Sequence, residues 1–322
     1  MLLSPLPMHI PDGFLSVVVS VFFWLISIGG IGFALRKVNQ VIGEREVPLM
    51  GVLAAAIFAG QMLNFTVTGG TSGHLMGAAL ATIIVGPWAA ILVMTSVVSI
   101  QALVFQDGGL LVLGANIFNM GILGVVLSAM VMQFIRKIFQ NRKKYLLGGS
   151  FIAGWLSIFI ASLAAGLELA ISGTSPVQIA VPAMAGIHAL IGIGEGLITL
   201  GAVLFLYINR PDLVTHPNEA KNANSGIVVA GVILTVLLAV LSPLASSHPD
   251  GLEWVAETAA FLNFAKESTY QIIPDYLLPG LHNEAVATIF AGLIGAVIVF
   301  GVIFVMMNQR KKQLPQRETD FE

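Results

Sequence analysis

The stretch that decides the fold is HLMGAALATIIVGPWAAILVMTSVVSIQALVF, residues 74–105. A transmembrane helix needs about 20 apolar residues, so this stretch is too long for one span and short for two. Gly86-Pro87 lies near its middle, and proline tends to end or kink a helix at such a point. The stretch therefore forms either one kinked helix or two short ones, and the choice sets the orientation of everything that follows it.

The composition of the whole chain defines its class. Of the 322 residues, 57% are hydrophobic and only 10% are charged, and the mean hydropathy is +0.91. These values indicate an all-α polytopic membrane protein in contact with lipid. The net charge of −2 gives no sign of a nucleic-acid partner, and the absence of cysteine excludes disulfides and thiolate metal sites.

Other apolar runs have the length of membrane spans. They are Phe14–Leu35, Pro48–Asn64, Leu111–Phe134, Tyr145–Ile171, Val177–Ile208, Ile227–Leu241 and Glu284–Met307.

The basic residues choose between the two interpretations of residues 74–105, because cytoplasmic flanks carry an excess of Lys and Arg. With a break at Gly86-Pro87 and an external N-terminus, fourteen of the fifteen basic residues are cytoplasmic, and only Lys266 is external. Without the break, the cluster around Arg142 would be outside. We therefore predict nine spans, with the N-terminus outside and the C-terminus in the cytoplasm. The cytoplasmic set is Arg36, Lys37, Arg45, Arg136, Lys137, Arg142, Lys143, Lys144, Arg210, Lys221, Arg310, Lys311, Lys312 and Arg317.

The spans divide into two modules. Residues 8–208 form a bundle of about seven helices, residues 209–225 form a polar cytoplasmic linker, and residues 226–310 form two further spans around an external loop. That loop, Ser242–Asn283, is acidic and partly helical by prediction. It either gathers cations, holds the N-terminal segment in place or is merely a solvated face.

Two histidines fall on the outer face in this topology. His9 precedes the first span, and His74 follows Thr71-Ser72-Gly73, which has the composition of a helix start. Neutral imidazoles without any cysteine suit a borderline metal such as Ni(II) or Co(II). The alternative is that each histidine only caps a helix or bonds a loop.

Few polar side chains lie inside the predicted spans, and such groups usually face the interior of a bundle. They are Gln101, Asn116, Asn119, His188 and Glu195. His188 and Glu195 share one helix face about 10.5 Å apart, so we expect each to find partners on neighbouring helices. A structural or coupling role is expected for this set. Gly192 and Gly196 form a small-xxx-small step that favours close helix contact.

Four ordered motifs resemble the CbiM/NikM family, the substrate-binding (S) components of energy-coupling-factor (ECF) transporters for cobalt and nickel. The motifs are MHIPDGFLS (8–16), NFTVTGGTSGHLMG (64–77), FQDGGLLVLGANIFNMG (105–121) and HALIGIGEGLIT (188–199). HPDGLE at 248–253 resembles the PDGLE domain of nickel-type members. The resemblance implies a multi-pass protein of a prokaryotic cytoplasmic membrane, a transported Ni(II) or Co(II) ion, and partners consisting of a transmembrane coupling (T) subunit and two ABC-type ATPases.

The resemblance also implies the ligands. The metal is held by the amino group of Met8, the backbone nitrogen and imidazole of His9, and the imidazole of His74, with Asn64 and Ser72 as groups that orient these ligands. Seven residues precede Met8, and an internal methionine has no free amine. We therefore expect the functional N-terminus at Met8. Pro11-Asp12-Gly13 provides the turn into the first span.

Other function classes remain as alternatives. No lysine follows a glycine, so a P-loop is absent, and neither His-Glu-x-x-His nor Gly-x-Ser-x-Gly occurs, so no catalytic apparatus is visible. An ion-gradient-driven Ni/Co permease would need mid-membrane ionisable residues, for which Glu195 and His188 qualify. An assembly subunit without a ligand, or a membrane enzyme with a dyad across helices, completes the set.

Overall fold

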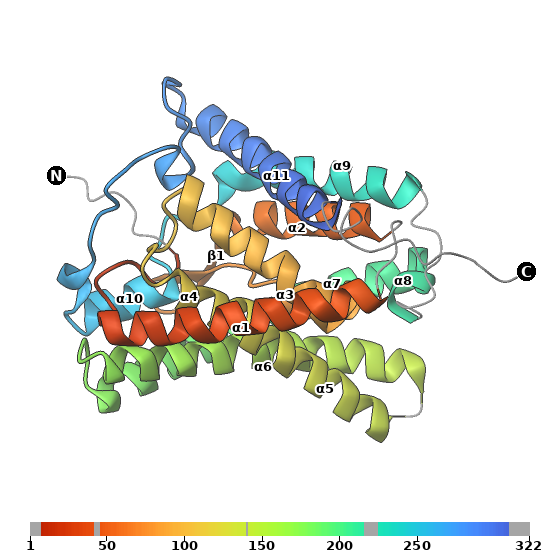
Figure 1. Cartoon of the computed structure of the whole chain (residues 1–322), viewed down its shortest axis with the longest axis horizontal. Helices are drawn as coiled ribbons and strands as arrows, with labels where there is room; N and C mark the ends of the chain where they lie inside the picture. Colours follow the sequence, from red (N-terminus) through yellow and green to blue (C-terminus); the bar gives the residue numbers. More distant parts are fainter. Residues whose placement is uncertain (1–7, 42–45, 140, 216–224, 309–322) are drawn as a thin grey trace, which may run out of the picture.

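The computed structural model describes residues 8–41, 46–139, 141–215 and 225–308, and within them the fold is almost entirely helical (Figure 1). The longer helices are α1 (Val17–Val41), α2 (Val47–Gln61), α3 (Ala78–Val104), α5 (Gly124–Ile138), α6 (Arg142–Ile171), α7 (Val177–Asn209), α9 (Ser225–Leu241) and α11 (Glu284–Asn308). Shorter elements join them, namely β1 (Phe65–Val67), β2 (Thr71–Gly73), α4 (Leu113–Asn116), the π-helix η1 (Ile117–Leu123), α8 (Pro211–Thr215), η2 (Ser242–Leu244), α10 (Gly251–Thr258), η3 (Leu262–Phe264) and η4 (Pro274–Tyr276). The predicted all-α membrane fold is confirmed.

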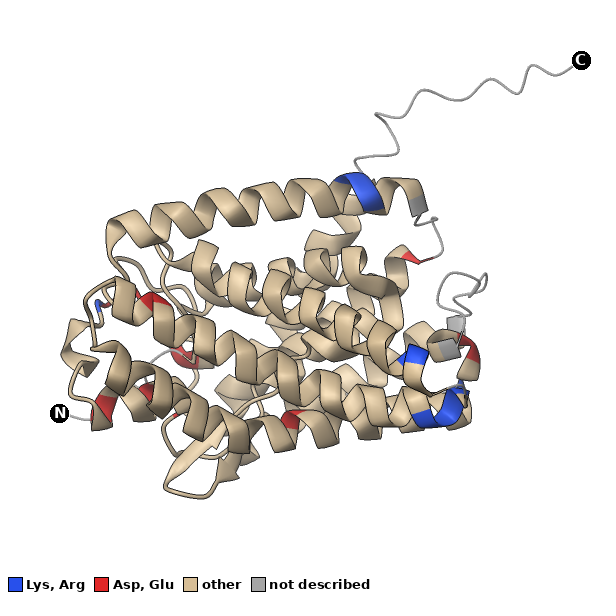
Figure 2. Cartoon of the chain, turned by 90° about the horizontal axis from the view of Figure 1, so that it is seen from below, with Lys and Arg blue, Asp and Glu red and all other residues tan. Residues whose placement is uncertain are grey.

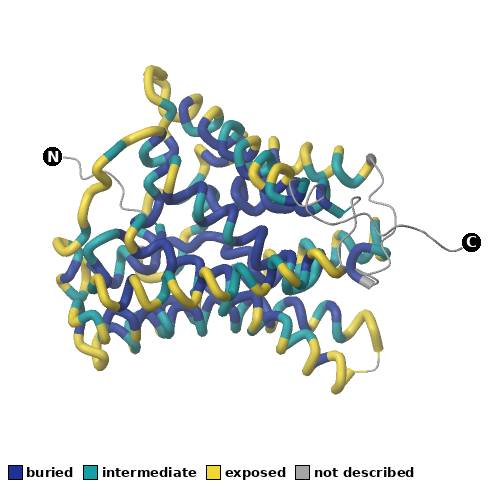
Figure 3. The backbone as a smooth tube through the Cα atoms, in the orientation of Figure 1, coloured by how far each residue is buried: buried dark blue, intermediate teal, exposed yellow. Residues whose placement is uncertain are grey.

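Helix length and exposed apolar side chains mark the surface that faces lipid. Seven helices in the described ranges are long and apolar enough to cross a membrane, with α3 counted once, and α2 is a shorter apolar helix. Large apolar residues such as Val18, Leu25, Ile171 and Val297 are exposed along these helices. In Figure 3 buried and exposed positions alternate along each helix, so one face of each points into the bundle. An apolar outer surface around a packed interior is what a bilayer requires.

The helix α3 reverses direction at Gly86. Gly86 has φ 76° and ψ 165°, a non-helical conformation, and Pro87 follows it. His74, before α3, and Asp107, after it, both contact His9, whereas Ile83 packs against Leu146 at the far end of the bundle. The chain therefore runs inward to Gly86 and back out, in agreement with the predicted break. With both halves of α3 and with α2, the described ranges hold nine helical segments directed across the bundle.

Charge separates the two ends of the bundle (Figure 2). Blue basic positions gather at one end, and red acidic positions are more frequent at the other. Arg136 and Lys137 lie in the last turn of α5, α6 starts at Arg142, and Arg210 follows α7. This distribution matches the predicted asymmetry. Arg45, Lys221, Arg310, Lys311, Lys312 and Arg317 lie outside the described residues.

Small residues allow the helices to approach closely. A Cβ added to Gly192 or Gly196 of α7 would come within 2.9 Å of the Trp155 or Phe151 side chain of α6, so the predicted small-xxx-small step is confirmed. The C-terminal helices use the same device on α2. A Cβ on Gly231 of α9 would lie 2.1 Å from Val52, and one on Gly295 of α11 would lie 2.1 Å from Phe58. Figure 1 shows α9 and α11 beside α2 at one side of the bundle.

Residues 65–73 correct one expectation. Thr71-Ser72-Gly73 does not begin a helix but forms β2, which pairs antiparallel with β1 around Gly69 and Gly70. Both glycines have positive φ, and Gly-Gly between β-branched residues is a hairpin signal. The helix starts four residues later than the histidine, after Gly77, so His74 lies on the connection between β2 and α3.

The predicted linker is also more ordered than expected. Its first part forms α8, in which Leu213 and Val214 are buried, and Arg210 bonds Asp212 at 2.7 Å. Residues 216–224 lie outside the described part, as do residues 1–7. The external loop is partly helical, as predicted, through η2, α10, η3 and η4.

We predict that Gly86→Ala lowers the melting temperature of the detergent-solubilised protein. The conformation at Gly86 is essentially restricted to glycine, and forcing another residue into it costs roughly 1–3 kcal/mol. Space is not the obstacle, because nothing lies within 4 Å of a Cβ at this position. Thermal unfolding followed by circular dichroism measures the effect.

Gly29→Ala is the matched control, since Gly29 also has open space but lies inside α1 with ordinary helical geometry. Alanine there leaves stability unchanged or raises it by roughly 0.5–1 kcal/mol. Equal melting temperatures for the two variants would contradict the strained reversal at Gly86.

Candidate metal centre

The N-terminal segment folds back into the bundle and is held by side chains that imitate a neighbouring strand. The backbone N–H of Ile10 donates to Oδ1 of Asn116 at 3.1 Å, and Nδ2 of Asn116 donates to the Ile10 carbonyl at 3.1 Å. The N–H of Gly109 also donates to that carbonyl at 3.0 Å. Asn116, predicted to have a structural or coupling role, therefore fixes the residue next to His9.

The turn at Pro11-Asp12-Gly13 is present, with Phe14 N–H donating to the Pro11 carbonyl at 3.3 Å. Asp12 does more than turn the chain. Its carboxylate accepts from the N–H groups of Leu110, Leu111 and Val112 at 2.9–3.2 Å, directly before α4. The sequence reasoning missed this role, although free amides at a helix start commonly bind an aspartate.

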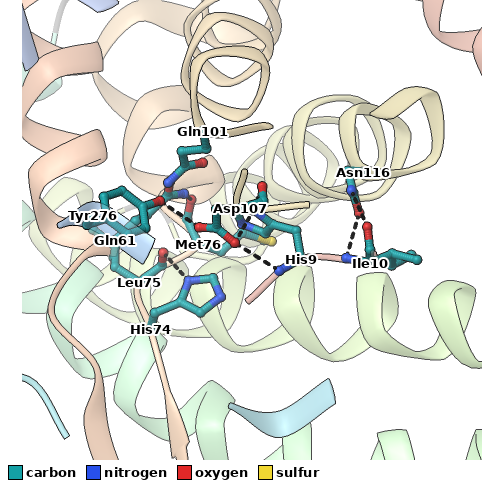
Figure 4. Close-up of polar contacts among 10 residues, drawn as sticks. All are labelled: His9, Ile10, Gln61, His74, Leu75, Met76, Gln101, Asp107, Asn116 and Tyr276. Atoms are coloured by element: carbon teal, nitrogen blue, oxygen red, sulfur yellow. Dashed lines mark hydrogen bonds and ion pairs between the residues drawn. The ribbon is translucent and has the colours of Figure 1, made fainter. Parts of the chain in front are cut away.

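His9 is buried, at 4% exposure, and two of its nitrogens turn toward Asp107 (Figure 4). Its backbone N–H donates to Asp107 Oδ1 at 3.3 Å, and its Nδ1 lies 3.4 Å from the same oxygen and 3.2 Å from the Asp107 carbonyl. Its Nε2 is buried and has no hydrogen-bond partner in the described residues. Asp107 was not predicted, and the only signal for it was an acidic residue before Gly-Gly at the end of a span.

His74 faces His9 from the connection between β2 and α3. Their ring centroids are 5.6 Å apart and the rings are nearly perpendicular, at 88°. Nδ1 of His74 lies 3.0 Å from the Leu75 carbonyl, and the residue is 8% exposed. The two histidines that the sequence placed on one face are therefore neighbours in one buried site (Figure 4).

The connection that carries His74 is braced by buried polar side chains. Glu195 accepts from the N–H groups of Met76 at 2.7 Å and Gly77 at 3.0 Å. Gln61 donates to the Met76 carbonyl at 2.8 Å, and Gln101 donates to Gln61 at 2.8 Å (Figure 4). Glu195 thus bonds backbone amides of a loop rather than a neighbouring helix. Gln61 was missed, because a lone glutamine near the end of an apolar run gives no distinctive pattern.

A cavity of about 80 Å³ opens between these groups. Its polar lining comprises His9, His74, Asn116, Asn119, Ser162, His188 and Asp250, and its other walls are mainly Met, Ile, Leu and Ala, with Met8 among them. About 10–15 Å³ of such volume suffices for one water, so the space accommodates a cation together with a few waters.

The remaining predicted residues lie as follows. Ser72 donates to the carbonyls of His248 and Pro249, and the Asn64 carbonyl accepts from Ser246, so both contact the C-terminal module and neither lines the cavity. Asn119 donates to Glu168 at 3.0 Å. His188 has its Nδ1 2.9 Å from the Met184 carbonyl one turn back on its own helix, which corrects the expectation of a partner on another helix.

The C-terminal module supports the site from behind. Tyr276 donates its hydroxyl to Asp107 Oδ2 at 2.6 Å and stacks on Phe105 with centroids 4.7 Å apart. Burial, and secondly the charge of Asp107, raise the pKa of Tyr276 well above its usual value, so it stays a donor. The same two causes raise the pKa of neighbouring Asp275 to about 6. Lys266 N–H donates to the Asp12 carbonyl at 2.7 Å, so the loop also closes over the N-terminal segment.

The donor set defines the available chemistry. Within the described ranges, no three His, Asp or Glu side chains converge closely enough to hold a metal ion by themselves. Two imidazoles do converge, and the backbone nitrogen of His9 lies on the same side as its ring. A metal centre here therefore needs main-chain nitrogens in addition to the imidazoles, and nitrogen-rich sites favour Ni(II), Co(II) or Cu(II) over Mg(II) or Ca(II).

Comparison with known protein families gives two consecutive matches. Residues 9–213 match the model of the cobalt uptake substrate-specific transmembrane region, CbiM, and residues 225–312 match the PDGLE domain. The chain is 38% identical over 302 residues to a protein named putative fused nickel transport protein NikMN from Archaeoglobus fulgidus, covering 93% of this chain and 98% of that one.

Further relatives carry nickel or cobalt names. The fused nickel transport protein NikMN of Rhodobacter capsulatus is 31% identical, over 78% of this chain and 76% of the relative. The cobalt transport protein CbiM of Geobacter sulfurreducens is 29% identical, over 76% and 72%. A crystal structure of a transition metal transporter superposes with a TM-score of 0.58 at 30% identity, covering 67% of this chain and 100% of that one.

Proposed function

The chain belongs to the CbiM family and carries a PDGLE domain behind the CbiM region, and from this membership we propose that it is the substrate-binding component of an ECF transporter importing Ni(II) or Co(II). Residues 8–208 form the metal-binding S component, 209–225 the cytoplasmic linker and 226–310 the PDGLE-type module. The N-terminus faces the outside and the C-terminus the cytoplasm, which the basic end of the bundle supports. Nickel is favoured, because nitrogen ligands bind it more tightly than cobalt.

The observation that carries the proposal is the pair of buried imidazoles facing one cavity, with one nitrogen left unpaired. A buried nitrogen without a partner is costly, by roughly 1–3 kcal/mol, unless a ligand binds it. The rings of His9 and His74 lie 5.6 Å apart, and Nε2 of His9 is such a nitrogen. A divalent cation between the imidazoles would remove this cost.

The amine of Met8 and the backbone nitrogen of His9 complete the proposed ligand set with the two imidazoles. Met8 lines the cavity, and the backbone nitrogen and Nδ1 of His9 already lie on one side of the residue, both toward Asp107. A chelate by one residue requires that arrangement. Four nitrogens in this order suit Ni(II), which accepts square-planar nitrogen ligands. Asp107, Asn116 and Glu195 position the ligands without being ligands.

The rival permease depends on mobile ionisable groups in mid-membrane. Glu195 is engaged by two backbone amides, and His188 has its Nδ1 next to the Met184 carbonyl. These contacts favour a structural role for both residues over proton or ion coupling.

We predict that His9→Ala and His74→Ala each weaken Ni(II) and Co(II) binding by at least about 100-fold. Loss of an outer-sphere partner alone typically costs 10–100-fold in metal affinity, and a direct ligand costs more. Isothermal calorimetry of the purified chain measures the affinity. It should also rise with pH, because the ligand nitrogens bind metal only when deprotonated.

His282→Ala provides the control, since His282 is exposed and distant from the cavity lining. Its affinity should equal that of the unmodified chain. Unchanged affinity in His74→Ala would contradict the proposed site, and equal losses in His282→Ala would indicate adventitious binding by surface imidazoles.

A second prediction concerns the amine of Met8. A chain beginning at Met8 should bind Ni(II) at least about 100-fold more tightly than one in which Met1–Pro7 is retained, because an amide nitrogen at residue 8 lacks the lone pair of an amine. Intact-mass spectrometry defines the first residue of each preparation before titration. Tight binding by the longer chain would contradict the amine as a ligand.

The third prediction concerns energy. The chain has no P-loop, so the proposed T subunit and two ATPases must supply ATP hydrolysis. Vesicles containing the chain alone should bind the metal ion without accumulating it, whereas vesicles containing the complete complex should accumulate it when ATP is present on the ATPase side. Accumulation by the chain alone under an ion gradient would favour the permease.

A further inference from the structure

The PDGLE motif places a carboxylate without a hydrogen-bond partner in the wall of the metal cavity. Asp250 precedes α10, is only 6% exposed and lines the same cavity as His9 and His74. It stands at the N-cap of α10 but does not cap it, and the described residues provide no hydrogen bond to its carboxylate. A buried unpaired carboxylate is unfavourable, so its position calls for a cation.

The position of Asp250 is fixed by the hairpin that leads to His74. Ser72 N–H donates to the Pro249 carbonyl at 2.8 Å, and its hydroxyl donates to the His248 carbonyl at 2.9 Å. Thr71 Oγ1 donates to the Pro249 carbonyl at 3.0 Å, and Ser72 and Asp250 form a parallel β-bridge. The motif is therefore docked on β2, two residues before one of the proposed metal ligands.

His188 lies next to Asp250 on the opposite wall. A Cβ added to Gly251 would come 3.1 Å from His188 Nε2 and 3.0 Å from its Cε1, so glycine after Asp250 gives the ring room. With Nδ1–H donating to the Met184 carbonyl, Nε2 carries a lone pair. Nε2 has no hydrogen bond within the described ranges, and His188 also lines the cavity.

We propose that Asp250 and His188 form a second position for the divalent cation in this cavity, occupied before the position at His9 and His74. The inference rests on the proposed function and deepens it, because the fused C-terminal module then contributes a ligand to the transported ion. One carboxylate oxygen and one imidazole nitrogen suit a first-row divalent metal. The negative charge in a cavity of low dielectric raises the local concentration of cations.

The two positions are used in turn rather than together. The cavity of about 80 Å³ has space for one ion and a few waters. Two divalent cations within it would repel strongly, since little solvent screens them. Asp250 therefore acts on the rate at which the ion reaches the nitrogen ligands more than on the final affinity.

The first test measures Ni(II) association with the full chain by stopped-flow quenching of tryptophan fluorescence. Asp250→Asn should lower the association rate constant about tenfold, with a smaller change in Kd, because a charge near an entrance acts mainly on association. Asparagine has nearly the same shape and is a good N-cap residue, so α10 should be retained. Glu257→Gln, an equal charge loss at an exposed position of the same helix, should stay within twofold of the unmodified rate.

The second test isolates the new position in a His74→Ala background, where Ni(II) affinity is measured by calorimetry. Residual weak binding should fall a further tenfold when Asp250→Asn or His188→Asn is added. His188→Asn keeps an amide donor near the Met184 carbonyl but lacks Nε2.

Unchanged association in Asp250→Asn, with residual binding unaffected by either added substitution, would overturn the inference while leaving the His9 and His74 site intact. Full affinity in His74→Ala alone would instead overturn the proposed function.

Discussion

Backbone polar groups buried at the edge of a membrane must all find partners inside the protein, and the N-terminal segment depends on this constraint more than any other part of the chain. Residues 8–13 have neither helix nor strand to satisfy them, so side chains do it instead. Asn116 bonds both backbone groups of Ile10, and Asp107 accepts the N–H of His9. The metal site exists because these contacts hold an irregular segment among helices.

The same contacts join the two modules. Asp107 accepts from His9 on one side and from the Tyr276 hydroxyl of the C-terminal loop on the other, and Asp12 is tied to Lys266 through its carbonyl. The hairpin β1–β2 carries His74 and also holds the motif that contains Asp250. The C-terminal loop therefore interacts with each of the two segments that supply imidazoles. The acidic loop is not merely a solvated face, since Asp250 is buried within it.

Much of this architecture was predictable from sequence, and its limits have physical causes. The reversal at Gly86 followed from length, proline and the distribution of basic residues, all of which act through the bilayer. His9 and His74 were recognisable by residue type and by the resemblance of their motifs. Asp107 and Asp250 were not, because their importance comes from contacts between residues about a hundred or more positions apart, such as Asp107 with His9 and Tyr276. Thr71–Gly73 was misassigned because residues that favour a helix start also favour a hairpin next to Gly-Gly.

Three loops rather than three helices meet at the cavity, and this has a consequence for binding and release. The loops before α1, before α3 and before α10 are connected to one another by neutral hydrogen bonds and by Asp107. A cation bound by donors from these loops adds attraction among segments that the helices alone do not fix, so binding stabilises the closed arrangement by mass action. Rotation of the whole bundle as a rigid body would leave every donor in place. Release therefore requires at least one loop to separate from the other two, and the segment of residues 8–13, which lacks regular secondary structure and is held mainly by hydrogen bonds, is the one whose displacement disrupts the least packing.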